Sequence, residues 1–212
     1  MGRYLILVVT LLIVSCARTD VHSFKDPKFA THQFQSIVVY APSMGLQERE
    51  VVESTAVAAL TSKGIPAIRS MEIVPPTRNL SVNEAAVEIM ATGYEAVLFF
   101  FETGKGTTET YVPPTYYPGS STSTVNVVGN TAYVNTQTNP GYTTGGYSIS
   151  KPVSAYSAAL LHTRTGEVAW QADLSARGSA FDDYENLAKS SARSAVADLS
   201  RKGLLMAPTT PN

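Results

Sequence analysis

The chain has few of the residues that carry most enzyme and metal chemistry. Its 212 residues include one cysteine and three histidines, His22, His32 and His162. One cysteine cannot form a disulfide within the chain, and histidines this scattered show no metal-ligand spacing. A dyad of His162 with Glu167 or Asp173 across a hairpin is the one nucleophile–base pairing that the sequence offers, and we expect a strand-end histidine to have no catalytic role. The sequence therefore predicts no enzyme, no cofactor and no metal.

Charge is also scarce. Charged residues make up 16% of the chain, the formal net charge is −1, and no basic run or stripe occurs. A typical globular chain has about a quarter of its residues charged. Nucleic-acid binding is therefore not expected. The length predicts one domain, which can bury a core without disulfides.

The longest hydrophobic run stands at the start. Residues 4–14 follow the basic Arg3 and are too few for a membrane helix, which needs about 20 apolar residues, but suit a signal peptide. The following "IVSC" resembles the bacterial lipobox, with Ile13 in place of the commoner Leu. This resemblance implies cleavage after residue 15 and acylation of Cys16. Since Ala17 follows rather than Asp, it further implies an anchor in the outer membrane, on the periplasmic face. The alternative is an ordinary secretory peptide with a chance cysteine.

Hydrophobic patterns along the rest of the chain alternate between strand and helix. Residues 16–34 have no sustained period and are expected to be a lipidated cysteine with its tether, and 206–212 a tail. The expected strands are 35–41, 65–70, 94–102, 153–162 and 167–175, and the expected helices are 46–63, 81–92 and 182–202. Ser81 and Glu84 form a capping-box pattern, and six consecutive apolar residues from 96 suit a strand covered on both faces. We expect a single α/β (α+β) domain over 35–205, a mixed sheet with about three helices packed on it.

A compositionally different insert, 103–150, interrupts this pattern. It holds two charged residues, twelve threonines and six of the eleven tyrosines. Residues 124–136 predict a β-hairpin turning at Gly129-Asn130, and the flanks, rich in proline and glycine, are expected to be irregular. The insert is either a surface segment without a role or a contact surface, because tyrosine is enriched in recognition surfaces. The partner-binding residues of the second hypothesis are Tyr111, Tyr116, Tyr117, Tyr133, Tyr142 and Tyr147.

The order of elements and several short stretches resemble a known group of periplasmic lipoproteins. "IVVYAPS", "GIPAIRS", "ATGYEAVLFFF" and "ALLHTRTGEVAWQADLSARG" are similar to the α/β fold of the curli-secretion lipoprotein, the activators of penicillin-binding proteins and the TolB amino-terminal domain. The likeness covers residues 36–204 without the insert. It departs at 162–164, where His-Thr-Arg stands and an Asp is common before the turn.

This resemblance implies a non-enzymatic part of an envelope assembly, such as a binding module, an activator or a pore subunit. Fold alone does not fix function. The first hypothesis is an adaptor or accessory subunit that is held to the membrane by a lipid on Cys16 and binds an envelope protein, peptidoglycan or a polysaccharide. The second is a homo-oligomer, a self-assembling subunit of a secretion or envelope ring.

Overall fold

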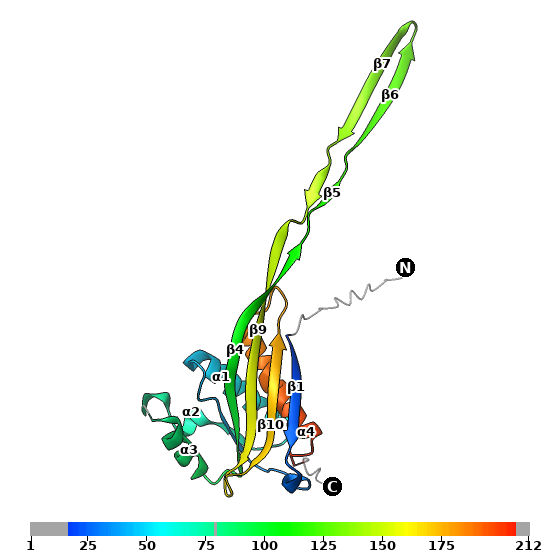
Figure 1. The fold of residues 1–212 in the computed structure, drawn as a ribbon. Helices are drawn as coiled ribbons and strands as arrows, with labels where there is room; N and C mark the ends of the chain where they lie inside the picture. The colour runs from blue at the N-terminus through cyan, green and yellow to red at the C-terminus, as the bar shows by residue number, and fades with distance from the viewer. Residues whose placement is uncertain (1–16, 79, 207–212) are drawn as a thin grey trace, which may run out of the picture. The chain divides into compact units, whose positions relative to one another are not determined.

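The computed structural model describes residues 17–78 and 80–206, which form two compact units (Figure 1). The globular unit comprises the described residues up to Thr107 and from Lys151 onward, and the ribbon unit is Thr108–Ser150. The insert expected at 103–150 thus separates from the domain five residues later than its composition indicates. The predicted signal peptide, Cys16 and residues 207–212 of the tail lie outside the described residues.

The globular unit is built on a six-stranded mixed sheet in the order β1-β10-β9-β4-β2-β3. β2 is parallel to β3 and to β4, whereas β10 is antiparallel to β1 and to β9. The mixed sheet with helices packed on it confirms the expected fold class. The strands are β1 (Arg18–Lys25), β2 (Ile37–Tyr40), β3 (Ala67–Arg69), β4 (Ala96–Val112), β9 (Tyr147–His162) and β10 (Val168–Arg177).

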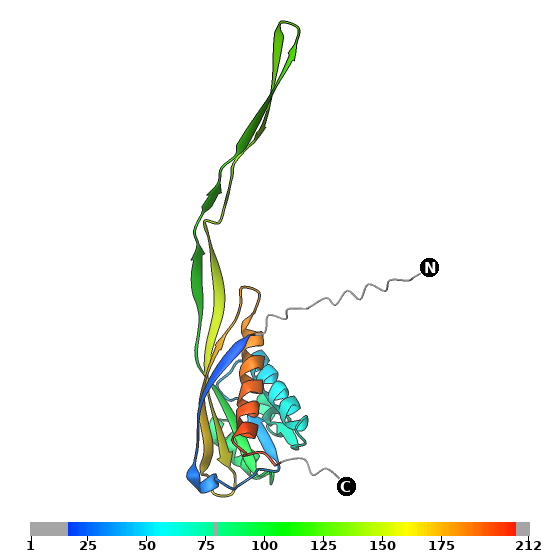
Figure 2. The same ribbon diagram turned by 90° about the vertical axis from the view of Figure 1, so that its right-hand side faces the viewer.

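Helices cover the sheet in two groups. The described residues form α1 (Leu46–Thr61), α2 (Ser70–Ile73), α3 (Val82–Met90) and α4 (Tyr184–Arg201), with short 3-10 turns at η1 (Pro27–Phe29) and η2 (Pro76–Arg78). α1 and α4 lie side by side on one face, as Figure 2 shows. The capping box is confirmed at the start of α3, where the Ser81 amide donates to a Glu84 carboxylate oxygen at 2.8 Å. This box satisfies amides that a helix start otherwise leaves free.

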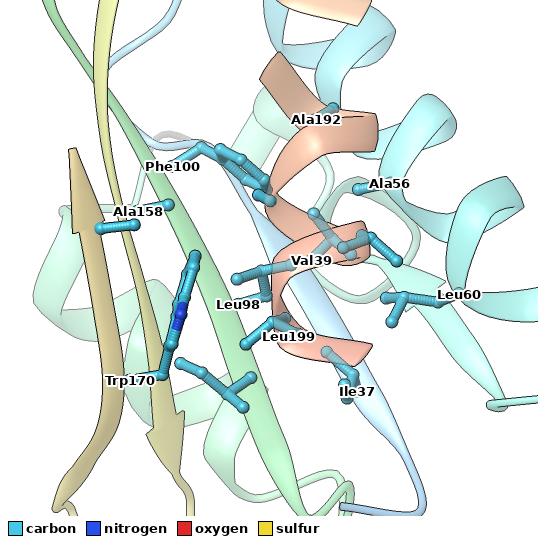
Figure 3. Packing of buried hydrophobic residues seen from close by; sticks show 14 of the residues in the cluster. Ile37, Val39, Ala56, Leu60, Leu98, Phe100, Ala158, Trp170, Ala192 and Leu199 are labelled. Atoms are coloured by element: carbon cyan, nitrogen blue, oxygen red, sulfur yellow. The ribbon is translucent and has the colours of Figure 1, made fainter. Parts of the chain in front are cut away.

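The central strands β2 and β4 are buried on both faces, as the apolar run predicted. Ile37 and Val39 of β2 point into the larger core, under α1 and α4, while Val38 and Tyr40 point into the smaller core under α3. In the larger core, Trp170 of β10 lies beside strand and α4 residues such as Leu199 (Figure 3). Alternation across two cores explains why these strands read as continuous apolar runs.

The segment expected to be a tether is instead part of the domain. β1 pairs with β10 along its whole length, from Arg18 opposite Arg177 to Lys25 opposite Trp170. Farther on, Phe29 and Phe34 are buried in the larger core. The sequence does not reveal this strand because Val21 is its one apolar side chain that packs against the core, and the inward Thr19 is a hydroxyl that hydrogen-bonds to Ser190 of α4 at 2.8 Å. An edge strand whose inward polar side chains form hydrogen bonds with a helix lacks the usual alternation of apolar and polar residues.

Candidate functional site

The ribbon unit is a two-stranded antiparallel β-structure. β5 (Thr115–Tyr117) pairs with β8 (Tyr142–Thr144), and β6 (Ser120–Val128) pairs with β7 (Thr131–Asn139). The predicted turn at Gly129-Asn130 is confirmed, and Gly129 takes the positive φ of 64° that such tight turns require. The hairpin is longer than the expected 124–136.

The flanks of the hairpin are irregular only in part. β5 and β8 are paired strands, whereas the prolines and glycines on either side of them lie outside the strands. At the glycines, the two segments of the ribbon unit approach each other closely. A Cβ atom on Gly145 would lie 2.3 Å from the Pro113 carbonyl oxygen, so only glycine fits there. The Gly146 amide donates to the Val112 carbonyl at 2.8 Å beside it. Composition alone cannot distinguish two segments in such close contact from an irregular loop.

All six tyrosines predicted to form a contact surface are exposed, between 46% and 65%. The structure brings two of them into contact: the rings of Tyr117 and Tyr142 stack with centroids 5.0 Å apart. The other four lie along the strands, Tyr111 on β4, Tyr116 on β5, Tyr133 on β7 and Tyr147 on β9. They are therefore spread over the ribbon unit and do not form one aromatic cluster.

The ribbon unit is exposed to solvent and almost uncharged. Apart from Val112, Gly145 and Ile149, all its residues of described burial are exposed, and Glu109 is its single charged residue. An isolated two-stranded hairpin is marginally stable in water. Natural proteins usually protect open strand edges with charges or prolines, yet β6 and β7 contain neither. Nothing in their sequence blocks the addition of a further strand.

The start of β1 and the strands that lead into the ribbon unit share one end of the sheet. Arg18 pairs with Arg177, which pairs with Val153 of β9, and Gly106 of β4 lies beside Val153. The residue before β1, Ala17, is held there by its carbonyl oxygen, which accepts a hydrogen bond from Ser190 of α4 at 2.8 Å. Cys16 is the next residue in the sequence and lies outside the described residues.

Three titratable side chains lie together at the other end of the sheet. The sequence did not predict this cluster. His32, Glu95 and His162 each offer an atom within 4.8 Å of the others. They line a pocket of about 650 Å³. The three are far apart in the chain and His32 was assigned to the tether, so no spacing rule could have found them. The spacing of these residues along the sequence predicted no metal site, and the fold brings three potential ligands together.

The hypothetical dyad of His162 with Glu167 or Asp173 is not formed. The His162 backbone amide donates to the Glu167 backbone carbonyl at 2.9 Å, but the Glu167 carboxylate accepts from Lys28 Nζ at 2.6 Å. This hydrogen bond and the nearby positive charge lower the pKa of Glu167. Asp173 is exposed, and its strand neighbours are His22 and Ser157.

Among the described residues, no helix combines the length and apolar character needed to cross a membrane. No family model matches the chain, and no curated protein matches it.

The chain is, in contrast, similar to several solved structures. A point-substituted PelC dodecamer from Paraburkholderia phytofirmans, crystallised in space group C2, is 17% identical, with 89% of this chain and 99% of that chain covered and a TM-score of 0.51. The PelC dodecamer from the same organism in space group P6 is 16% identical with the same coverage and a TM-score of 0.48. Lipoprotein GNA1162 from Neisseria meningitidis is 15% identical over 78% of this chain and 98% of that chain, with a TM-score of 0.43. At these identities the likeness to the point-substituted PelC structure shows a common fold and nothing further.

Proposed function

We propose that the chain is an outer-membrane lipoprotein, anchored through Cys16 on the periplasmic face, that acts as a non-enzymatic adaptor or accessory subunit of an envelope assembly. In this proposal the ribbon unit binds the partner, a protein or a glycan of the envelope. The observation that carries the proposal is the ribbon unit itself, 43 residues from Thr108 to Ser150 with one charge.

The energetics of the ribbon unit support a bound state. The hairpin of two nine-residue strands, β6 and β7, is a single layer and has no second layer against which to bury either face. Val125 and Val134 pair on one face and are 56% and 64% exposed. A partner that covers these valines removes apolar surface from water, at about 25 cal/mol per Å². The neighbouring tyrosines add large contact area at low entropic cost, for protein or sugar alike.

The position of the anchor supports an envelope role for the same surface. Because Ala17 is fixed against α4, a lipid on Cys16 would keep the adjacent end of the sheet at the membrane. The strands β4 and β9 leave the globular unit at that end. The chain therefore enters and leaves the ribbon unit at the end of the sheet that would meet the lipid surface.

A second candidate function is self-assembly into an oligomeric envelope or secretion ring. Within the described part of the chain, β6 and β7 each pair only with the other, which leaves two different open edges on one molecule. The β6 edge of one copy can therefore pair with the β7 edge of the next, a head-to-tail contact that forms a ring when the rotation between copies closes and an open filament when it does not. The point-substituted PelC structure, whose fold this chain shares, is a dodecamer.

Cross-linking in cells tests both candidates. The full-length tagged lipoprotein is compared with a variant in which residues 108–150 are replaced by a short Asn-Gly turn, and captured molecules are identified by mass spectrometry. One dominant envelope protein or glycan that disappears in the variant supports the adaptor, and self-capture that disappears supports the ring. Identical captures from both chains would overturn the assignment of binding to the ribbon unit.

The anchor has its own test. We expect Cys16→Ala to release the protein from the membrane fraction and to abolish acylation detected by mass spectrometry. Ser15→Ala keeps a small residue before Cys16 and serves as the matched control. A wild-type protein whose Cys16 carries no acyl chain by mass spectrometry would contradict the lipoprotein assignment.

A further inference from the structure

The cluster of His32, Glu95 and His162 has the composition of a transition-metal site. His32 follows η1, Glu95 precedes β4, and His162 ends β9, so three separate parts of the globular unit supply the side chains. His32 Nε2 lies 2.8 Å from Glu95 Oε1, and the two imidazole rings have centroids 5.5 Å apart. Two imidazole nitrogens and one carboxylate oxygen form a common ligand set for zinc.

His32 carries an atom that the protein leaves without a hydrogen bond. Its Nε2 is buried, and the approach to Glu95 Oε1 does not have hydrogen-bond geometry. Buried polar atoms nearly always have a partner, so an exception calls for an explanation. A bound cation that accepts the Nε2 lone pair and neutralises the neighbouring carboxylate supplies one.

The surroundings hold each side chain in a ligating pose. Glu95 Oε2 accepts from the Gln35 amide at 2.8 Å, which leaves Oε1 for the cluster. His162 Nδ1 lies 2.9 Å from Thr165 Oγ1, and a proton on Nδ1 leaves Nε2 free to bind. Such outer contacts are typical of metal-binding histidines and carboxylates. Phe34 packs against both imidazoles, at 4.5 Å from His32 and 5.9 Å from His162 between ring centroids.

The spacing of the three atoms fits an ion after small side-chain adjustments. Bond lengths of about 2.0–2.2 Å in a tetrahedral site place ligand atoms about 3.4 Å apart. The His32–Glu95 approach of 2.8 Å must therefore widen, and the longer separations, all within 4.8 Å, must shorten. The proposal requires side-chain rotations of this size in the three residues.

We propose that these three residues bind one divalent transition-metal ion of the zinc class. Its fourth coordination position faces the pocket that also borders Gln35 and Thr163, and water fills it. The ion joins the segment after β1 to the start of β4 and the end of β9. Metal binding therefore stabilises the attachment of the amino-terminal segment to the sheet. This site is independent of the proposed binding role of the ribbon unit.

Zinc titration of the full-length lipoprotein in detergent tests the proposal. The protein carries no polyhistidine tag and is first stripped with a chelator, and isothermal titration calorimetry then measures binding. We expect one ion per chain and, at a hundredfold excess over Kd, an increase in Tm of about 5–10 °C. Magnesium, which prefers oxygen ligands, should leave Tm unchanged.

Variants identify the ligands. We expect His162→Ala, His32→Ala and Glu95→Gln each to weaken zinc binding by at least about tenfold. His22→Ala removes an exposed histidine on β1 and should bind as the wild type does. Far-UV circular dichroism in chelator shows whether each variant is folded. Cobalt added to the wild-type protein gives a second readout, a visible spectrum of a four-coordinate site with nitrogen ligands, that needs no variant. The absence of binding by the wild type, or binding by folded His162→Ala equal to that of the wild type, would overturn the proposal.

Discussion

Tyr117 and Tyr142 face each other across the ribbon unit, with ring centroids 5.0 Å apart and ring planes 18° from parallel. They are directly opposed in the register of β5 and β8. Since the ribbon unit has no core, cross-strand pairs of this kind are the side-chain contacts that hold its strands together. A stacked aromatic pair contributes about 0.5–1.5 kcal/mol beyond area burial.

We expect Tyr117→Ser to loosen β5 and β8 without affecting the globular unit. Loss of the stack should accelerate hydrogen exchange of amides in Thr115–Tyr117 and Tyr142–Thr144 by up to about tenfold. The Tm of the globular unit should stay the same. Tyr133→Ser, at a tyrosine opposite Asn126, is the control and should leave those amides unchanged. Equal exchange in Tyr117→Ser and the wild type would show that the stack does not hold the strands.

Replacing residues 108–150 by a short Asn-Gly turn should leave the globular unit folded. The segment contributes no residue to either hydrophobic core. The contacts that hold the end of β4 lie outside it: Lys105 Nζ pairs with Glu48 at 2.9 Å, and the Tyr184 hydroxyl donates to the Gly106 carbonyl at 3.0 Å. We expect a Tm within about 2 °C of the wild type, which corresponds to less than about 1 kcal/mol. A loss of cooperative unfolding would contradict the division into two units.

A buried ion pair ties α1 to its surroundings. Glu53 is fully buried and accepts from Arg49 Nε at 2.9 Å and from the Ser70 hydroxyl at 2.6 Å. Arg49→Ala leaves a buried carboxylate without its counter-charge and should lower the free energy of unfolding by about 3–5 kcal/mol. Urea denaturation measures this loss.

The control for Arg49 is the exposed pair of Arg78 and Glu88, which are 2.7 Å apart. Arg78→Ala should cost no more than about 1 kcal/mol. Adding Glu53→Gln to Arg49→Ala should recover part of the loss, because it removes the unpaired charge. An Arg49→Ala cost as small as that of Arg78→Ala would refute the buried-charge explanation.

Asp198 makes the stability of the globular unit depend on pH. Burial raises the pKa of this carboxyl, but hydrogen bonds from Ser23, Arg201 and Trp170 outweigh burial and hold the pKa below its ordinary value of 3.8. The Trp170 indole N–H donates to it at 2.9 Å. Since the folded pKa is lower than the unfolded one, Asp198 stabilises the fold above pH 3.8, and this contribution is lost as pH falls through the folded pKa.

We expect Trp170→Phe to lower the free energy of unfolding at pH 7 by about 1.5–3 kcal/mol from the lost charge-assisted hydrogen bond alone. In this variant the pKa of the Asp198 carboxyl should rise toward its ordinary value. The difference between variant and wild type should therefore shrink as pH falls below about 4. Urea denaturation at pH 7, 5 and 3 measures it, and a difference that stays constant over this range would exclude Asp198 as the source.

Sequence patterns predicted the parts of the fold whose residues interact locally or are buried on both faces. The apolar run from Ala96 predicted β4, and the Ser81 capping box marked α3. β1 was missed because only Val21 among its inward residues packs against the core, while Thr19 is polar and hydrogen-bonds to α4. The short paired strands β5 and β8 were missed because the prolines and glycines on either side of them are typical of irregular chain.

The two candidate sites differ in how far the sequence reveals them. The tyrosines of the ribbon unit stand out in composition, and the structure places all six at its surface. The cluster around Glu95 is invisible in the sequence, since only the packing of Phe29 and Phe34 brings His32 back to the sheet. Lipidation of Cys16 and the outer-membrane location stay predictions from the lipobox resemblance.

Site-specific photo-cross-linking from the ribbon unit tests the central claim most directly. The ribbon unit contains no lysine, so amine-reactive reagents cannot report its contacts, and a photoactivatable amino acid is placed at Tyr133 instead. Val87, 63% exposed on α3, is the control position. If the ribbon unit binds an envelope partner or a second copy, irradiation of living cells gives a discrete adduct from Tyr133 and none from Val87. No adduct from Tyr133, or the same adducts from both positions, would contradict the claim that the ribbon unit is the binding surface.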